Sequence, residues 1–259
     1  MSHFPQTLQR WRKARRFSQL DLAGEAGVSA RHIAFLETGR ARPSSAMVAR
    51  LGDALGLPLA ARNQMLTLAG FATRYPGRAW DDDDMAPVRA AITHVLARHA
   101  PWPALAVDRL WRVTAMNAPA RTLFGTLGVG EGGSLIDLML SETLPPLIEN
   151  WPDVAHHAAQ RLRTESAGQG GVAELDAAAE ALARVPGGAN MALGPVVPTI
   201  YRMGDVRLAL FAILAQFGTP DDLTLDDMKI ELYFPADDAS AATLTALAMA
   251  APLGQNAPA

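Results

Sequence analysis

Short amphipathic stretches, separated by serine and glycine, fill the first seventy residues of the chain. Within each stretch apolar residues recur every three or four positions, as on one face of a helix. This pattern predicts five helices, at 7–15, 19–26, 30–38, one that opens at 43–45, and 58–69. Ser18 and Ser29 are the expected N-caps of the second and third helices, and Gly27 and Gly39 are expected to stop them.

From about residue 85 the helical period alternates with short strand-like runs. Helices are predicted at 85–98, 117–125, 141–150, 154–165, 172–184 and 240–250, and strands at 104–108, 112–116, 196–202, 206–217 and 229–234. Two strands, several helices and then three strands predict an α+β domain with one antiparallel sheet.

The segment between these regions, GFATRYPGRAWDDDD, contains glycine, proline and four consecutive aspartates, which is typical of a solvated linker. We therefore expect an all-α domain at 1–70, a linker at 71–84, a second domain at 85–252 and a frayed tail at 253–259.

Composition narrows the class of protein. A chain of 259 residues with 49% hydrophobic and 19% charged residues is globular and long enough for two cores. It has no cysteine, and its six histidines lack metal-ligand spacing, so we expect no metal site and no disulfide. The N-terminus lacks the apolar core of a signal peptide, and no apolar run reaches the roughly 20 residues that span a bilayer. We expect a cytoplasmic protein without a membrane contact.

Charge is unevenly distributed along the sequence. Residues 1–80 hold 12 Lys and Arg against 4 Asp and Glu, whereas the remainder holds 11 against 22. A basic first domain beside an acidic second one suggests that only the first meets a polyanion, although surface charge can also divide this way by chance.

The stretch SQLDLAGEAGVSARHIAFLETGRARPS, at 18–44, has the pattern of a helix-turn-helix. Two short helices joined by a tight turn cross steeply, and the second can then enter the major groove of double-stranded DNA. Its outward face would carry Ala30, Arg31, His32 and Phe35. Arg31 can pair with guanine, while Phe35 or Ala30 can touch thymine methyl groups.

Other residues at the helix ends are candidate phosphate contacts. Ser18, Gln19 and Ser29 lie at the starts of the two helices, and Arg40 and Arg42 follow the second helix.

Alternatives remain for the helix pair and for its side chains. It could belong to an ordinary helical bundle, with Arg31 a plain surface arginine. We expect His32 to pack or to contact phosphate rather than to read a base. Glu37 should hydrogen-bond to the backbone or to an arginine of its own domain, because phosphate would repel its carboxylate.

These residues resemble the Xre/lambda-repressor family of regulators. The matching positions are Gln19, Leu22, Ala23, Gly27, Val28, Ser29, Ile33, Leu36, Glu37, Gly39 and Pro43. The strings RHIAFLETGRARPS, GLPLAARNQMLTLAGFA, PALAVDRLWRVTAMN and FGTPDDLTLDDMKIELYFPAD, together with Asn150-Trp151-Pro152, resemble the MmyB-like subfamily of bacterial regulators. Ala30 and Ala34 stand where relatives often carry polar groups, so DNA shape would supply part of the specificity.

The resemblance implies a PAS-like second domain that binds a small apolar or amphipathic molecule, such as an acyl chain. Candidate ligand contacts are Trp111, Phe124, Trp151, His156 and Phe211, although aromatic residues at such spacing can equally be plain core. No motif supports a cofactor or a catalytic group: AGQGG lacks the Lys-Ser/Thr of a phosphate loop.

The leading hypothesis is a ligand-responsive transcription regulator that binds an inverted repeat as a homodimer. A binding protein or enzyme that carries a DNA-binding domain for localisation is a second hypothesis. A protein whose second domain only dimerises or holds a protein partner is a third.

Overall fold

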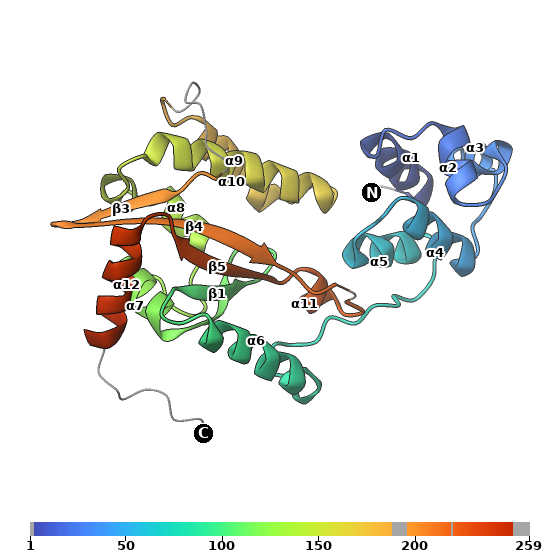
Figure 1. The fold of residues 1–259 in the computed structure, drawn as a ribbon. Coiled ribbons are helices and arrows are strands. Elements are labelled where there is room, and N and C mark those ends of the chain that lie inside the picture. The colour runs from blue at the N-terminus through green and yellow to red at the C-terminus, as the bar shows by residue number, and fades with distance from the viewer. Residues whose placement is uncertain (1–2, 188–195, 219, 251–259) are drawn as a thin grey trace. The chain divides into compact units, whose positions relative to one another are not determined.

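The computed structural model describes residues 3–187, 196–218 and 220–250 (Figure 1). The chain divides into two compact units. The first is built mainly from the N-terminal helices up to Gly77, and the second contains the sheet and the helices that cover it.

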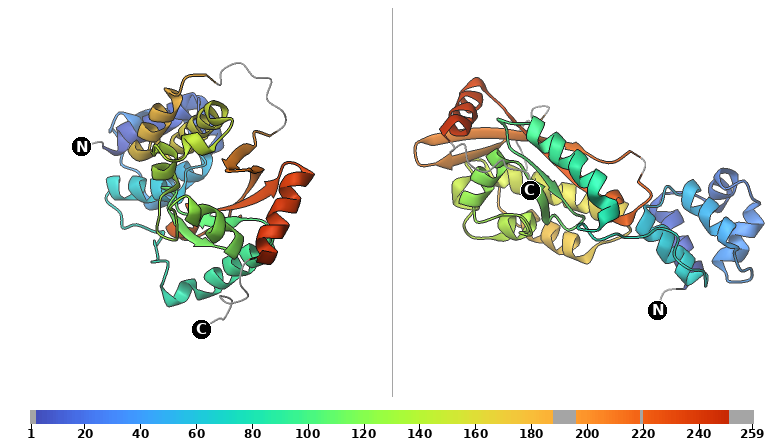
Figure 2. Two further views of the ribbon diagram at one scale, coloured as in Figure 1. Left: turned by 90° about the vertical axis from the view of Figure 1, so that its left-hand side faces the viewer. Right: turned by 90° about the horizontal axis from the view of Figure 1, so that it is seen from below.

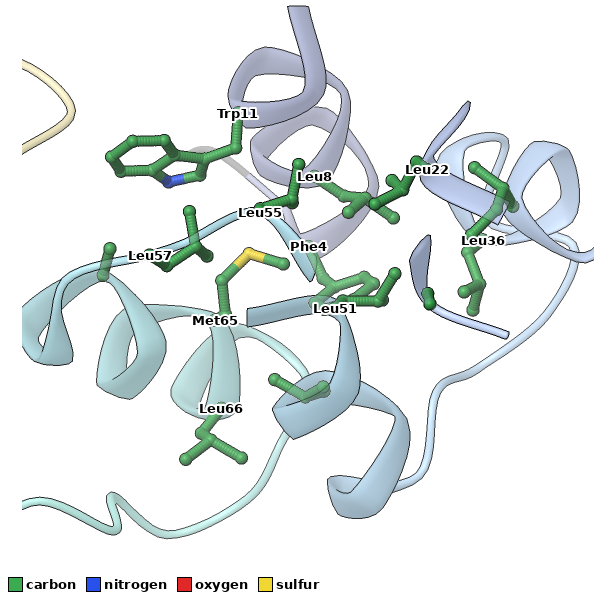
Figure 3. Close-up of a cluster of buried hydrophobic side chains, with 14 of the residues drawn as sticks. Phe4, Leu8, Trp11, Leu22, Leu36, Leu51, Leu55, Leu57, Met65 and Leu66 are labelled. Carbon is green, nitrogen blue, oxygen red and sulfur yellow. The ribbon is translucent and has the colours of Figure 1, made fainter. Parts of the chain in front are cut away.

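Five helices form the N-terminal unit, as the sequence predicted. They are α1 (Phe4–Ala14), α2 (Gln19–Glu25), α3 (Ala30–Glu37), α4 (Ser45–Ala54) and α5 (Leu59–Leu68). Each turns an apolar stripe inward, and the stripes meet in one core that includes Leu8, Trp11, Leu22, Leu51 and Met65 (Figure 3). Burial of these side chains is the main stabilising contribution to a domain of this size.

Local signals fix where the helices begin and end. Ser18 and Ser29 accept hydrogen bonds from backbone N–H groups of the first turns of α2 and α3, as expected of N-caps. Gly27 and Gly39 have φ of 60° and 73°, which glycine adopts at low cost. The first helix begins at Phe4 rather than at residue 7, because Pro5 is compatible with the first turn, where no N–H partner is needed.

The second unit contains one five-stranded antiparallel sheet with the strand order β2-β1-β5-β4-β3. Its strands are β1 (Ala104–Val107), β2 (Val113–Met116), β3 (Thr199–Met203), β4 (Val206–Ala215) and β5 (Lys229–Pro235). Gly204 and Asp205 form the predicted hairpin turn between β3 and β4. This is the α+β fold with one antiparallel sheet that the PAS-like resemblance implied.

Helices cover both faces of this sheet (Figures 1 and 2). They are α6 (Ala86–Arg98), α7 (Ala118–Thr126), α8 (Leu135–Leu140), α9 (Trp151–Gly168), α10 (Ala173–Ala183) and α12 (Asp238–Ala250). Helices α6 and α12 lie on one face, and α9 and α10 lie on the other. A core of Ile92 and Leu96 from α6 packs on Ile230 of β5.

One predicted helix is wrong. Residues 141–150 hold only the 3-10 turn Pro145–Leu147, whereas the α-helix in this region, α8, ends at Leu140. The pair Pro145-Pro146 cannot donate backbone hydrogen bonds and so prevents an α-helix there. Ser134, which accepts from the Asp137 N–H, caps the helix that sequence reasoning missed.

The segment expected to be a linker is held to its neighbours at both ends. The Asn63 side chain hydrogen-bonds the backbone of Arg74 and Tyr75, and the Arg89 guanidinium donates to the carbonyls of Trp80 and Asp82. A 3-10 turn, Asp83–Met85, and a short helix, α11 (Leu223–Asp226), were not predicted. The expected tail at 253–259 lies outside the described residues.

Candidate functional site

The turn between α2 and α3 sets the position of the second helix of the motif. The Val28 N–H donates to the Ala23 carbonyl across this turn, next to the left-handed Gly27. The Arg50 guanidinium, from α4, donates to the carbonyls of Ala26 and Gly27. These bonds satisfy the end of α2 and hold α3 at a fixed angle, as a helix that reads DNA requires.

The nine residues predicted to contact DNA belong to α2, α3 and the segments that flank them. Ser18, Ser29, Arg31, Arg40 and Arg42 are exposed, and Gln19, Ala30, His32 and Phe35 are half-buried. The Arg31 guanidinium lies 5.1 Å from the centroid of the Phe35 ring, within cation–π range.

The structure separates arginines that stabilise the domain from arginines that face solvent. Arg12, Arg15, Arg50 and Arg62 each donate hydrogen bonds to carbonyls or carboxylates of the N-terminal unit. By contrast, five arginines have side chains that form no hydrogen bond or ion pair with any described residue: Arg10, Arg16, Arg31, Arg40 and Arg42. The charge available to a polyanion is therefore concentrated on and just after α3 and near the end of α1.

Glu37 pairs inside the domain, as the sequence predicted. Its carboxylate accepts from Arg12 Nε and Nη2 at 2.6 and 2.9 Å and from Gln19 Nε2 at 2.8 Å. Burial raises the pKa of Glu37, but these hydrogen bonds and the positive charge of Arg12 outweigh it and hold the pKa below its ordinary value. The Gln19 amide, expected to hold a phosphate, is thus engaged with Glu37.

A cavity of about 300 Å³ lies in the second unit, against the sheet. This volume is at the lower end of the roughly 300–1,000 Å³ typical of small-molecule sites. Most of its wall is apolar. The apolar lining residues are Phe124, Leu135, Leu138, Met139, Leu144, Ile148, Val154, Ala158, Val196, Val197, Leu210, Phe211 and Ala212.

Ionic and aromatic groups form the polar part of the wall. Arg161 of α9 donates to Glu165 at 3.0 Å and to Glu231 of β5 at 2.7 Å, and its guanidinium lies 4.1 Å from the centroid of the Trp111 ring. Glu165 also accepts from Lys229 and from Trp111 Nε1. We refer to Arg161, Glu165, Lys229 and Glu231 as the ionic cluster.

Trp111 is held in a strained backbone conformation beside this cluster. Its φ is 62°, which is rare for a bulky residue. Asp108 maintains the turn, because its side chain accepts the N–H groups of Leu110 and Arg112 and its carbonyl accepts the N–H of Trp111. The conformation places the indole against Arg161 and in the cavity wall. Strain of this kind persists where the surrounding contacts over-determine it, often at functional sites.

Two tyrosines also line the polar part of the wall. The Tyr233 hydroxyl donates to Glu231, whereas the Tyr201 hydroxyl forms no hydrogen bond with any described residue. Burial, and then the charge of Glu231, raise the pKa of both tyrosines well above the ordinary value. Both hydroxyls therefore stay protonated, and that of Tyr201 is available in the cavity wall.

Three of the five predicted ligand residues line this cavity: Trp111, Phe124 and Phe211. Trp151 and His156 do not line it. The His156 ring is hydrogen-bonded to the Pro152 carbonyl on its own helix, and it is the next residue, His157, that reaches the cavity. Sequence reasoning missed the polar wall, although the alternation KIELYF at 229–234 already placed a lysine and a glutamate in a mostly apolar strand.

Two protein-family models match the chain, one in each unit. Residues 4–65 match a helix-turn-helix domain, and residues 88–247 match the ligand binding domain of MmyB-like transcription regulators. The chain is thus a transcription regulator that joins a DNA-binding domain to a ligand-binding domain.

The second match spans more than half of the sequence. The chain therefore belongs to the MmyB-like transcription regulators. A comparison with curated proteins found no significant match. No helix within the described ranges is long and apolar enough to cross a membrane.

Proposed function

We propose that this protein is a one-component regulator that binds an inverted repeat as a homodimer and responds to a small apolar or amphipathic ligand. The observation that carries the proposal is the presence, in one chain, of a helix-turn-helix with solvent-facing arginines and a ligand-binding domain with a mostly apolar cavity. Enclosed apolar walls with a few convergent polar groups are typical of small-molecule sites.

In the DNA complex α3 would occupy the major groove. Arg31 would read a guanine, with Phe35 or Ala30 against a thymine methyl group. Arg40 and Arg42 would contact phosphates, as would groups at the starts of α2 and α3 and His32. Arg31, Arg40 and Arg42 are exposed, and their side chains form no hydrogen bond or ion pair with any described residue, which supports these roles.

Dimerisation follows from the affinity that one helix-turn-helix can reach. A single domain with one main reading arginine offers few base contacts, and paired domains on half-sites about 34–36 Å apart, or a multiple, would double them. We place the DNA-binding domain at 1–70, the linker at 71–84, and ligand binding and dimerisation in 85–252.

The decisive experiment selects operator DNA with the full-length protein and then tests ligands against that complex. We expect a palindromic footprint, a dimer by light scattering, and affinity that falls steeply with salt because phosphate contacts release counterions. Native mass spectrometry and solvent extraction would identify a retained ligand.

Coupling supplies the second readout. If the ligand lowers the affinity for operator DNA by some factor, typically about 5–150-fold, operator DNA must lower the affinity for the ligand by the same factor. Unequal factors, or a monomer on the operator, would refute the proposal. If no ligand is found and no apolar compound raises the melting temperature, the second domain instead dimerises or holds a protein partner.

A further inference from the structure

The ionic cluster at the cavity is electrically balanced. It holds two cations, Arg161 and Lys229, and two carboxylates, Glu165 and Glu231. The side chains of Lys229 and Glu231 are only 5% and 3% exposed, so solvent does little to screen them. The positive charge of Arg161 is thus matched before any ligand arrives.

Because the ionic cluster is balanced, a charged group on a ligand is unfavourable in the cavity. A carboxylate that enters must leave water, and it would meet a guanidinium already held between two carboxylates, one of which, Glu231, lines the same wall. An ammonium group meets the converse problem, because each carboxylate of the cluster already has a cationic partner. An uncharged polar group incurs neither cost.

Hydrogen bonding is nevertheless available to an uncharged group. Tyr201 lines the cavity, and its hydroxyl forms no hydrogen bond with any described residue. Nη1 of Arg161 forms no hydrogen bond with any described residue and can donate to a neutral acceptor. A neutral ligand oxygen can accept a hydrogen bond from the Tyr201 hydroxyl.

We propose that the cavity selects apolar ligands whose polar group is uncharged, such as an alcohol, amide or ester, over carboxylates and amines with the same chain. Tyr201 bonds the neutral oxygen, and the balanced ionic cluster rejects charge. This inference rests on the proposed ligand-binding function and adds the chemical class of the ligand.

The test compares four compounds that share one ten-carbon chain: decan-1-ol, decanamide, decanoate and decylammonium. Dissociation constants are measured on the full-length protein at one fixed pH, below the aggregation limit of each compound. We expect the alcohol and the amide to bind about tenfold or more tightly than both charged compounds, since an unmatched charge at low dielectric costs at least that much.

Variants that change the net charge of the ionic cluster should shift the preference toward a charged ligand. Glu231→Gln leaves the cluster with one excess positive charge and should favour decanoate, whereas Lys229→Gln should favour decylammonium. Glu165→Gln has the same charge effect as Glu231→Gln from a different position, and so guards against a folding defect in either variant. Glu131→Gln, at an exposed glutamate that pairs with Arg121, is the matched control and should leave the preference unchanged.

The outcomes separate the two proposals. If decanoate binds the wild-type protein more tightly than the alcohol, the charge argument is overturned while ligand binding stands. The same holds if His157→Gln abolishes the preference for uncharged ligands, because His157 lines the cavity but does not belong to the ionic cluster. Loss of alcohol and amide affinity in Tyr201→Phe supports the assigned hydrogen bond. If none of the four compounds binds, the ligand function fails and this inference fails with it.

Discussion

Each unit of the protein buries an arginine between polar partners, and the two arginines differ in what lies beside them. In the helix-turn-helix unit, Nε, Nη1 and Nη2 of Arg12 all donate to Glu37 or to the Phe17 carbonyl. In the ligand-binding unit, Arg161 bridges Glu165 and Glu231 and also forms part of a cavity wall. The same ionic chemistry stabilises a fixed core in one case and borders a space for a ligand in the other.

A buried ion pair therefore indicates function only together with its surroundings. Arg12 and Glu37 connect α1 to the end of α3, and each of the three guanidinium nitrogens of Arg12 has a partner within the protein. The ionic cluster of the second unit stands next to an unpaired tyrosine hydroxyl and a strained tryptophan. Strained and incompletely paired groups are common where a site is prepared for a partner outside the chain.

The largest expected effect comes from breaking the Arg12–Glu37 pair. Arg12→Ala leaves the Glu37 carboxylate, whose side chain is 1% exposed, without its cation. Removal of one partner of a buried pair costs about 3–5 kcal/mol. Hydrogen exchange of amides in α1 to α3 of the full-length protein would measure the loss. Arg10→Ala, at an exposed position without a partner among the described residues, should change stability by less than about 0.5 kcal/mol.

The next largest expected effect is a loss of DNA affinity when the solvent-facing arginines, rather than Arg12, are replaced. Arg31→Ala should cost about 1–3 kcal/mol on the cognate operator and relax the preference at one base pair per half-site. Arg40→Ala should weaken cognate and random DNA alike and lower the salt dependence. Binding isotherms on both DNAs at several salt concentrations decide this, and the reverse pattern would mean that the two roles are exchanged.

A comparable free-energy difference should distinguish the packing of the two units. Ala23 of α2 is 2% exposed within the helical core, so Ala23→Leu should destabilise its unit by about 1–3 kcal/mol through overpacking. Ala158 of α9 faces the cavity, so Ala158→Leu should be neutral or stabilising by about 0.5–2 kcal/mol, as in other filled cavities.

Ligand binding provides the second readout for this pair of variants. Ala158→Leu should lose affinity for decan-1-ol while it stays folded, whereas Ala23→Leu should keep that affinity. Destabilisation by Ala158→Leu equal to that of Ala23→Leu would show that the cavity does not exist in solution.

More of the helical unit than of the ligand cavity could be predicted from the sequence, and the reason is physical. Caps and glycine stops act within a few residues, so Ser18, Ser29, Gly27 and Gly39 were visible in the sequence itself. The ionic cluster joins α9 to β5, with Arg161 and Glu231 separated by 70 positions, and no local pattern connects them.

Aromatic residues illustrate the same limit. Trp111, Phe124 and Phe211 were selected as bulky residues of the second domain and line the cavity, but Trp151 was selected on the same grounds and does not. Which face of a helix or strand turns toward a cavity depends on tertiary packing. The sequence pattern predicts the element and its period, and for short elements it does not determine which residues border an empty space.

The smallest expected effect is the acid dependence of the helical unit. Because the pKa of Glu37 is lower in the folded domain than its ordinary value of 4.5, its ionised form stabilises the fold. That contribution is fully present above the unfolded-state pKa and is lost as the pH falls through the lower, folded-state pKa. We therefore expect the amides of α1 to α3 to lose protection from hydrogen exchange below about pH 4.5.

In Glu37→Gln this part of the acid dependence should disappear, at the cost of lower stability at neutral pH. Glu25→Gln removes an exposed carboxylate of α2 and controls for the general effect of losing an acid, since the Glu25 side chain forms no hydrogen bond or ion pair with any described residue. An acid profile that is unchanged in Glu37→Gln would mean that Arg12 and Glu37 do not form their pair in solution.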